Sequence, residues 1–217
     1  MKMWGDCLVG NIFVLKTSCL LHDPPNKAWR LRDHREEARK IASEILKGTS
    51  LEYLVEKGKI IAIADEMERI AKQADIYASS VDRWLLSKLV GEDYSLFPVE
   101  DVKLKNIFNP KFYQSIRERP AENYVNKFAE SLNNLIRHIR DPRLAYHVLY
   151  ASYEPIWIEL GLPSGPADTR APTHTVFDHN YATASMMNWL LKGREPDGIL
   201  LYIDLGRVQR FISSSRK

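Results

Sequence analysis

Prolines and glycines divide most of this chain into segments whose apolar residues recur at helical spacing. Apolar residues are dense over 8–21, and Pro24 with Pro25 must end a helix there, since proline lacks the backbone N–H and restricts the residue before it. The clearest amphipathic helix spans 60–85, where polar residues separate apolar positions three or four apart. The pattern predicts a mainly α fold.

Three further helices are predicted in the second half of the chain, the first over 120–139 and the second over 142–161. The apolar stripe of the first consists of Tyr124, Phe128, Leu132, Leu135 and Ile139. The proline that opens the first is expected in its first turn, where the missing N–H costs nothing. Asp141 should cap the second helix, Pro155 should kink it, and the glycine at 161 should end it. The third is capped by Thr173 or Thr175 and continues to about position 191.

The remaining segments are of two kinds. Residues 91–111 have weak periodicity and scattered turn residues, which predicts an irregular segment with room for one short helix. Residues 198–204 form a short apolar run typical of a β-strand, and 207–214 have a helical pattern. A lone strand cannot form a sheet, so we expect 1–196 to be one helical domain and 197–217 the truncated start of another.

Composition excludes several classes of protein. Hydrophobic residues make up 45% and charged residues 27%, which are typical of a soluble globular domain. A net charge of +3 permits a polyanionic partner without requiring one. The two cysteines, Cys7 and Cys19, are too few for a disulfide framework, and no apolar run approaches the roughly 20 residues of a membrane span. We expect a cytoplasmic protein that does not enter membranes.

His22 and Asp23 form an adjacent pair at the predicted end of the first helix. Imidazole and carboxylate ligands can converge on one cation there, because the last helical turn is distorted. This nitrogen and oxygen set suits manganese, iron, cobalt or nickel better than a structural zinc. Such a pair also occurs by chance in roughly a third of chains with this composition. A solvated histidine interacting with the helix dipole is the alternative interpretation.

Two further segments contain candidate ligands among small residues. Asp75 lies on the long predicted helix beside Ala71, Ala74 and Ala78, which would let a ligand or another helix approach. His179 lies near the start of the last helix, in the segment FDHNYATAS. The alternatives are an ordinary exposed acid at Asp75 and a histidine bonded to a loop carbonyl at His179.

Together these segments resemble the HD phosphohydrolase superfamily, whose helical core gathers histidines and aspartates around one or two metal ions. The segment similar to the superfamily's first histidine comes last here, which implies a circularly permuted domain. Such permuted domains occur in the large, polymerase-like subunit of type III CRISPR complexes. The resemblance to the Cmr-type, III-B branch is carried by LLHDPPNKAW (20–29), ADTRAPTHTVFDHNYATA (167–184) and DGILLYIDLGRVQRFI (197–212).

The resemblance implies that four residues bind the metal: His22, Asp23, Asp75 and His179. His34 would complete a second metal site, although a histidine in so charged a run is as often merely solvated. Lys27 would contact phosphate, but here it is displaced by one residue from the usual H-D-x-G-K pattern. His174 and Asp178 would orient His179. The implied cofactor is one or two manganese, nickel, cobalt or iron ions.

The implied activity is metal-assisted hydrolysis of phosphodiesters, with Asp23 as a base for the attacking water. The substrate would be single-stranded DNA, cut within an RNA-guided antiviral complex that contains other Cmr subunits, a guide RNA and a target RNA. Basic residues after the His-Asp pair would follow the DNA backbone, or would form a solvated helix face. They are Arg30, Arg32, Arg35, Arg39 and Lys40.

Two alternatives remain open at this point. The domain could be an idle scaffold that docks neighbouring subunits, which predicts a poorly assembled ligand set. It could also be an ordinary nucleotide phosphohydrolase, which the palm-like segment at 197–217 disfavours. That segment resembles the start of a ferredoxin-like palm, and no G-G-D-D motif occurs in the chain.

Overall fold

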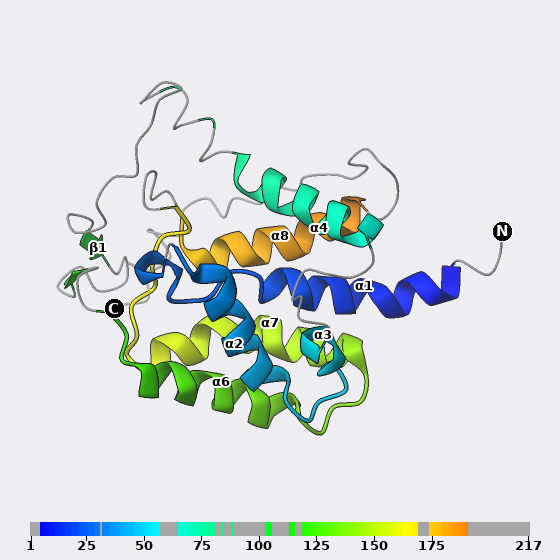
Figure 1. The fold of residues 1–217 in the computed structure, drawn as a ribbon, viewed down its shortest axis with the longest axis horizontal. Helices are drawn as coiled ribbons and strands as arrows, with labels where there is room; N and C mark the ends of the chain where they lie inside the picture. Colours follow the sequence, from blue (N-terminus) through cyan, green and yellow to red (C-terminus); the bar gives the residue numbers. More distant parts are fainter. Residues whose placement is uncertain are drawn as a thin grey trace, which may run out of the picture.

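Helices form almost all of the regular structure that the computed structural model describes (Figure 1). The described residues are 5–30, 32–56, 65–80, 84, 88, 103–105, 113–115, 119–168 and 174–190. Within them the prediction of a mainly α fold is confirmed. None of the helices in these ranges is long and apolar enough to cross a membrane. The strand, helix and second domain predicted within 197–217 lie outside the described residues.

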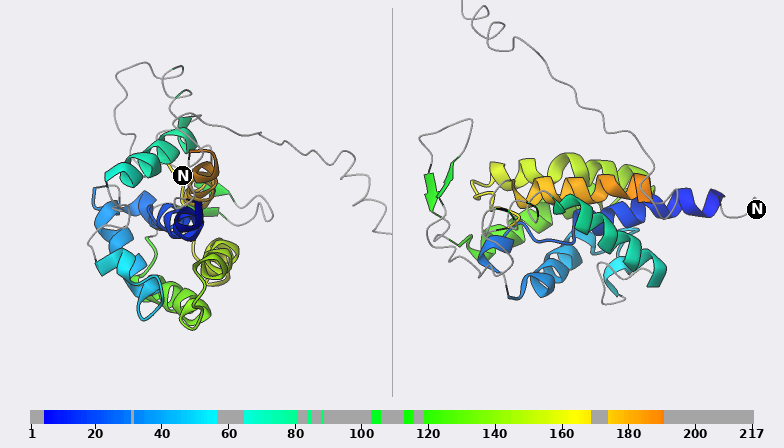
Figure 2. Two further views of the ribbon diagram at one scale, coloured as in Figure 1. Left: turned by 90° about the vertical axis from the view of Figure 1, so that its right-hand side faces the viewer. Right: turned by 90° about the horizontal axis from the view of Figure 1, so that it is seen from above.

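The first helix, α1 (Gly5–Leu20), lies in the middle of the molecule (Figures 1 and 2). It packs against α8 (Val176–Leu190) on one side and α7 (Pro142–Glu159) on another. α1 and α8 run antiparallel, so the end of α1 lies beside the start of α8 (Figure 1). As predicted, the helix ends ahead of the two prolines at 24 and 25.

Two layers flank this pair of helices. On one side α4 (Asp65–Ala78) packs against α8, where the small side chains of Ala71 and Ala74 are buried. On the other side α6 (Glu122–Ile136) packs against both α7 and α2 (His34–Leu46). The structure also describes two short helices, the 3-10 helix η1 (Lys27–Trp29) and α3 (Tyr53–Glu56).

The boundaries of α7 follow the predicted signals. The side chain of Asp141 accepts a hydrogen bond from the backbone N–H of Arg143, and proline follows it in the first helical turn. Pro155 lies inside the helix, as expected. Gly161 follows the end of the helix with φ of 72°, a left-handed conformation that favours glycine.

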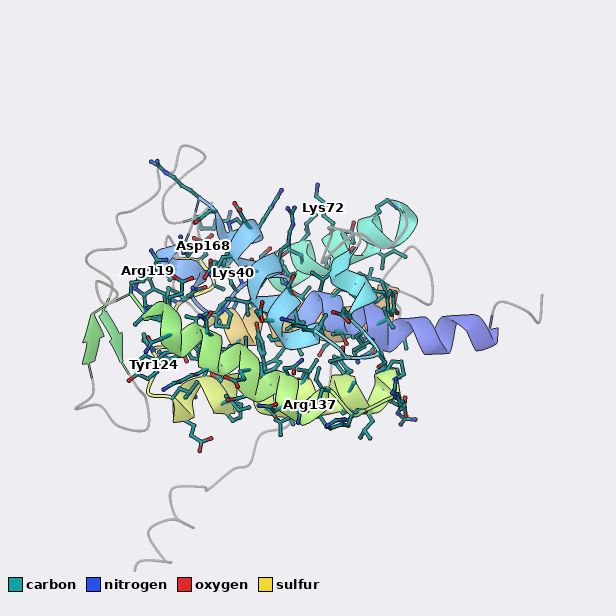
Figure 3. All side chains as sticks on the ribbon, turned by 60° about the horizontal axis from the view of Figure 1, so that its bottom comes forward. Lys40, Lys72, Arg119, Tyr124, Arg137 and Asp168 are labelled. Atoms are coloured by element: carbon teal, nitrogen blue, oxygen red, sulfur yellow. The ribbon has the colours of Figure 1, made fainter. Side chains whose placement is uncertain are left out.

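The prediction for α6 needs two corrections. The helix begins at Glu122 with Ala121 as N-cap, so Pro120 precedes the helix instead of lying in its first turn. Tyr124 and Leu135, expected in the buried stripe, are 41% and 47% exposed; Figure 3 labels Tyr124 on the outer side of α6. Because α6 packs against two helices, its buried face is displaced to neighbouring positions. That face consists of Val125, Phe128, Ala129, Leu132 and Ile136.

The segment 91–111 was expected to be irregular or to hold a short helix, but its described residues form a strand. β1 (Lys103–Lys105) pairs antiparallel with β2 (Tyr113–Ser115), with Lys103 opposite Ser115. Three-residue strands are too short to show alternation, and pairing depends on a partner further along the chain. Local periodicity therefore gave no signal for this hairpin.

An aromatic cluster fills the space between α6, α7 and α8. Trp157 contacts Phe128 edge-on at a centroid distance of 5.1 Å and Phe177 at 6.2 Å. Tyr153 lies 5.4 Å from each of the same two rings. All four side chains are almost fully buried. This cluster anchors the start of α8, the element that carries His179, against α7.

Candidate metal centre

His22 and Asp23 lie in the turn that follows α1, and both are buried. The Nδ1 atom of His22 is 2.6 Å from the carbonyl oxygen of Cys19 in the last turn of α1. A carbonyl only accepts, so Nδ1 carries the hydrogen, and the neutral ring has its lone pair on Nε2. The unpaired carbonyls at the end of α1 thus orient this imidazole toward the interior of the domain.

His179 comes from α8, in the first turn of the helix. Thr175 caps that helix: its hydroxyl accepts from the N–H of Asp178, and its own N–H donates to the Asp178 carboxylate. The capped turn fixes His179 so that its Nε2 lies 3.3 Å from Nε2 of His22. The other ring nitrogen, Nδ1, is buried with no hydrogen-bond partner in the described part of the chain.

Asp75 reaches the same point from α4. Its Oδ1 lies 3.0 Å from Nε2 of His179 and 3.7 Å from Nε2 of His22. The small buried side chains at positions 71 and 74 let α4 approach α8 closely enough for this contact. With its side chain 37% exposed, Asp75 is the most accessible of the four residues.

The four side chains surround one common point. Asp23 Oδ2 lies 3.6 Å from Nε2 of His22 and 3.7 Å from Nε2 of His179. Nitrogen and oxygen donors bound tetrahedrally to one cation at about 2.0 to 2.2 Å lie about 3.3 to 3.6 Å from one another. The ligand atoms of His22, Asp23 and His179 all fall within 4.8 Å of one another, and Asp75 contacts both rings. The donor set fits a divalent cation.

The charges in the cluster also suit a cation. Burial would raise the pKa of Asp75, but hydrogen bonds from His179 and His22 outweigh it and hold this pKa well below its usual range. Burial likewise opposes ionisation of Asp23, yet the charges of His22 and Lys27 lower its pKa. Both carboxylates are therefore ionised at neutral pH and can accept a cation.

The pKa values of the two histidines shift in opposite directions. Burial would lower the pKa of His22, but the Asp23 and Asp75 carboxylates outweigh it and raise the pKa. For His179, burial is the dominant effect and the pKa is lowered, although Asp75 opposes the change. A cation that binds Nε2 of either ring takes the place of the proton that this atom donates to Asp75.

Comparison with known proteins gives one curated relative and one solved structure. The chain is 36% identical to the CRISPR system CMR subunit Cmr2 of Saccharolobus solfataricus, in an alignment that covers 93% of this chain and 20% of that protein. The chain is homologous to the N-terminal region of Cmr2. It spans about a fifth of the length of that relative. No protein-family profile matches the chain.

The solved structure is a cryo-EM structure of the type III-B Cmr-beta complex in the apo state. One of its chains shares 32% sequence identity with this chain at a TM-score of 0.53. The match covers 82% of this chain and 17% of the other. The two comparisons agree, because each pairs most of this chain with a small part of a much longer subunit.

Lys27, the predicted phosphate contact, lies at the edge of the cluster. It begins η1, one helical turn after Asp23, and its Nζ is 2.5 Å from Asp23 Oδ2. The turn is held by Asn26, whose amide donates to the buried carboxylate of Glu37 on α2. The loop also packs tightly against Gly165, where a Cβ atom would lie 2.9 Å from the Cβ of Ala28.

His34 does not join the group of close ligand atoms, which among the described residues consists of His22, Asp23 and His179. It is the first residue of α2 and is half-buried. Its assignment to a second metal site stays a prediction.

The residues predicted to orient His179 differ in their contacts. The carboxylate of Asp178 accepts from the N–H and the hydroxyl of Thr175, so it caps α8. The ring of His174 lies 6.0 Å from the ring of His179, measured between centroids. Asp178 thus acts on His179 through the helix end and not through the imidazole.

Part of the basic run after the His-Asp pair is engaged in ion pairs. Arg30 contacts the carboxylates of Asp33, at 2.9 Å, and Glu37, at 3.5 Å. Lys40 pairs with Glu122 and so links α2 to α6. These two side chains stabilise local structure, which reduces the number of cations available for a nucleic-acid backbone.

Asn180 was missed by the sequence interpretation. Its side chain is fully buried, and its Nδ2 donates to the backbone carbonyl of Asp23 at 2.9 Å. The residue lies inside the long motif around His179, but its partner is 157 positions away. Only the antiparallel pairing of α1 with α8 brings the two together.

Proposed function

We propose that this chain is a metal-dependent nuclease module that cleaves single-stranded DNA within an RNA-guided type III-B CRISPR complex. The observation that carries the proposal is the convergence of His22, Asp23, Asp75 and His179 on one point at distances suited to a cation. Homology to Cmr2 and to a Cmr-beta chain supports the assignment to the complex. Other Cmr subunits, a guide RNA and a target RNA are the proposed partners.

The same proposal includes the domain organisation. Residues 1–196 form a circularly permuted HD-type domain, and 197–217 begin a ferredoxin-like palm domain. The chain order of the ligands supports the permutation, because the histidine that resembles the superfamily's first one follows the others. A hydrolase of this kind would act in the cytoplasm.

A divalent cation such as manganese, nickel, cobalt or iron, bound at this centre, would polarise a phosphoryl oxygen and lower the pKa of a neighbouring water. The chain itself supplies the remaining roles. Asp23 is ionised and buried, so its carboxylate can take the proton of the attacking water. Lys27 lies beside Asp23 and is partly exposed, so its ammonium can donate to a phosphate oxygen. His34 remains our candidate for a second ion.

The idle scaffold is less well supported than the nuclease. A scaffold places no demand on the positions of ligand atoms, and it predicts a poorly assembled set. Here three residues that are almost fully buried and one partly exposed carboxylate face one another across three helices. Burying so many ionisable groups is unfavourable unless they are paired or bind a cation.

The test compares metal binding and cleavage in matched variants of the chain. With manganese or nickel present, the parent should bind metal and cut single-stranded DNA faster than duplex DNA. The double variant His22→Ala, Asp23→Ala should lose both properties while keeping its helical circular dichroism, since neither side chain belongs to the hydrophobic core. A metal-loaded crystal should show ligand distances of about 2.0 to 2.3 Å.

The control also removes one histidine and one carboxylate. Glu130→Ala with His138→Ala changes two exposed side chains at α6, away from the cluster, and should leave binding and cleavage unchanged. If the His22, Asp23 double variant cuts as well as the parent, the nuclease proposal is wrong.

A further inference from the structure

Asn180 joins two of the three segments that supply the candidate ligands. It follows His179 directly on α8 and is fully buried. Its Nδ2 donates to the backbone carbonyl of Asp23 at 2.9 Å, and its Oδ1 has no partner in the described part of the chain. A buried amide with one half unpaired is unfavourable for stability, because an apolar side chain of the same size would bury without that penalty. This cost indicates a role other than packing.

The carbonyl of Asp23 needs an external donor because α1 has already ended. The last intrahelical contact of this helix is the bond from the N–H of Leu21 to the carbonyl of Thr17, and the next backbone bond is from Lys27 to Pro24. Asp23 lies between these two bonds. In the part of the chain that the structure describes, the bond from Asn180 is the only hydrogen bond to the backbone carbonyl of Asp23.

The bond also fixes one candidate ligand relative to another. Its donor is adjacent to His179 on a rigid helix, and its acceptor belongs to the same residue as the Asp23 carboxylate. The 3.7 Å separation between Asp23 Oδ2 and Nε2 of His179 is therefore set across a single short bridge. Groups that orient ligands in this way typically contribute a factor of 10 to 100 in metal affinity.

We propose that Asn180 is a positioning residue of the metal centre, which acts by holding the Asp23 backbone against α8. This inference rests on the proposed function, because it presupposes that the cluster binds a cation. It assigns to Asn180 a role in aligning Asp23 with His179 and no direct contact with metal or substrate.

Asn133 provides a matched control, because it forms the same kind of bridge elsewhere. Its Nδ2 donates to the carbonyls of Ile45 at 2.9 Å and Lys47 at 2.7 Å, and so ties α6 to the end of α2. It is not among the residues near the cluster. Asn180→Leu and Asn133→Leu each remove an interhelical amide bridge, but only the first removes a bridge to a ligand-bearing residue.

The experiment measures Mn²⁺ affinity by calorimetry in the 217-residue chain, together with hydrogen exchange of the metal-free chain. Asn180→Leu should weaken Mn²⁺ binding by about tenfold and speed exchange over 21–30, whereas Asn133→Leu should change the affinity by less than about twofold. Asn180→Ala, which leaves room for a water to bridge to Asp23, should weaken binding less than leucine does. It serves as the test if the leucine variant does not fold.

Three results would overturn the inference. Asn180 variants that fold and bind Mn²⁺ as tightly as the parent would exclude a positioning role while leaving the proposed function intact. Equal affinity losses in Asn133→Leu and Asn180→Leu would show that general destabilisation explains both. A parent chain that does not bind Mn²⁺ would overturn the proposed function, and this inference with it.

Discussion

The buried side chains on the two sides of α1 differ in their chemistry. On the side of α4 and α8, the interior contains imidazoles, carboxylates and amides that face one another. On the side of α6 and α7, it contains the aromatic cluster around Trp157, whose indole N–H donates to the carbonyl of Pro163. Two side chains on the polar side, those of His179 and Asn180, have a buried polar atom that lacks a partner among the described residues. Asn26 and Arg30 also have such an atom, but they lie in the loop before α2, where both contact Glu37.

This contrast shows how one helical fold can hold a buried polar site. Each unpaired buried polar group costs about 1 to 3 kcal/mol, while burial of a large aromatic side chain contributes roughly 1.5 to 3 kcal/mol. The aromatic side therefore offsets the cost of the polar side. α8 takes part in both, since Phe177 joins the aromatic cluster and His179 joins the polar one.

The largest expected effect concerns the aromatic side. Trp157→Ala should lower the free energy of unfolding by about 3 to 5 kcal/mol, because it empties a fully buried site and removes the bond to Pro163. Trp84→Ala is the control, since this side chain is 60% exposed, and should change the value by less than about 0.5 kcal/mol. Urea unfolding followed by circular dichroism measures both. Similar small losses in the two variants would mean that the aromatic side does not carry the stability.

A smaller effect is expected on the polar side, where the free energy of unfolding should depend on pH through Asp75. Because the pKa of Asp75 is depressed in the folded chain, its contribution to stability is present above the unfolded value of about 3.9 and is lost as pH falls through the folded pKa. In the metal-free chain, Asp75→Asn should therefore be less stable than the parent at pH 7, and the two should converge in acid. Urea unfolding at several pH values tests this, with Glu130→Gln expected to follow the parent. If the free energies of unfolding of Asp75→Asn and the parent change in parallel with pH, the depressed pKa of Asp75 is contradicted.

The smallest expected effect concerns residues 197–217. If 197–217 begins a separate domain, its deletion should change the stability of the helical part by less than about 1 kcal/mol, or roughly 2 to 4 °C in melting temperature. A thermal melt of the shortened chain gives the answer. Unfolding of the whole domain would mean that this segment belongs to the helical core, and that the boundary after residue 196 is wrong.

Much of the fold could be predicted because its signals are local. The proline pair after α1, the cap at Asp141 and the glycine at 161 each act within one helical turn, and all three were identified. The hairpin of β1 and β2 was not predicted, because strand pairing depends on a distant partner. The misplaced buried face of α6 has a similar cause, since its contacts with two other helices determine which residues are covered.

The candidate site could be predicted only in part from the sequence. The residues that converge, His22, Asp23, Asp75 and His179, were identified through the resemblance to HD enzymes, and their predicted convergence agrees with the geometry. Their roles remain predictions. Asn180 could not be assigned from the sequence, because a buried asparagine within a helix has no periodic signature and its acceptor is a backbone atom in the turn after α1, 157 positions away.

The antiparallel pairing of α1 with α8 also determines when the centre can form during synthesis. His22 and His179 are 157 positions apart, which at about 5 to 20 residues per second takes a ribosome roughly 8 to 30 s to translate. Throughout that interval the turn after α1 has neither its imidazole partner nor the amide that caps Asp23. The nascent chain therefore cannot bring His22, Asp23 and His179 together until α8 has emerged, so under the proposed function a cation can be bound only after α8 has been translated.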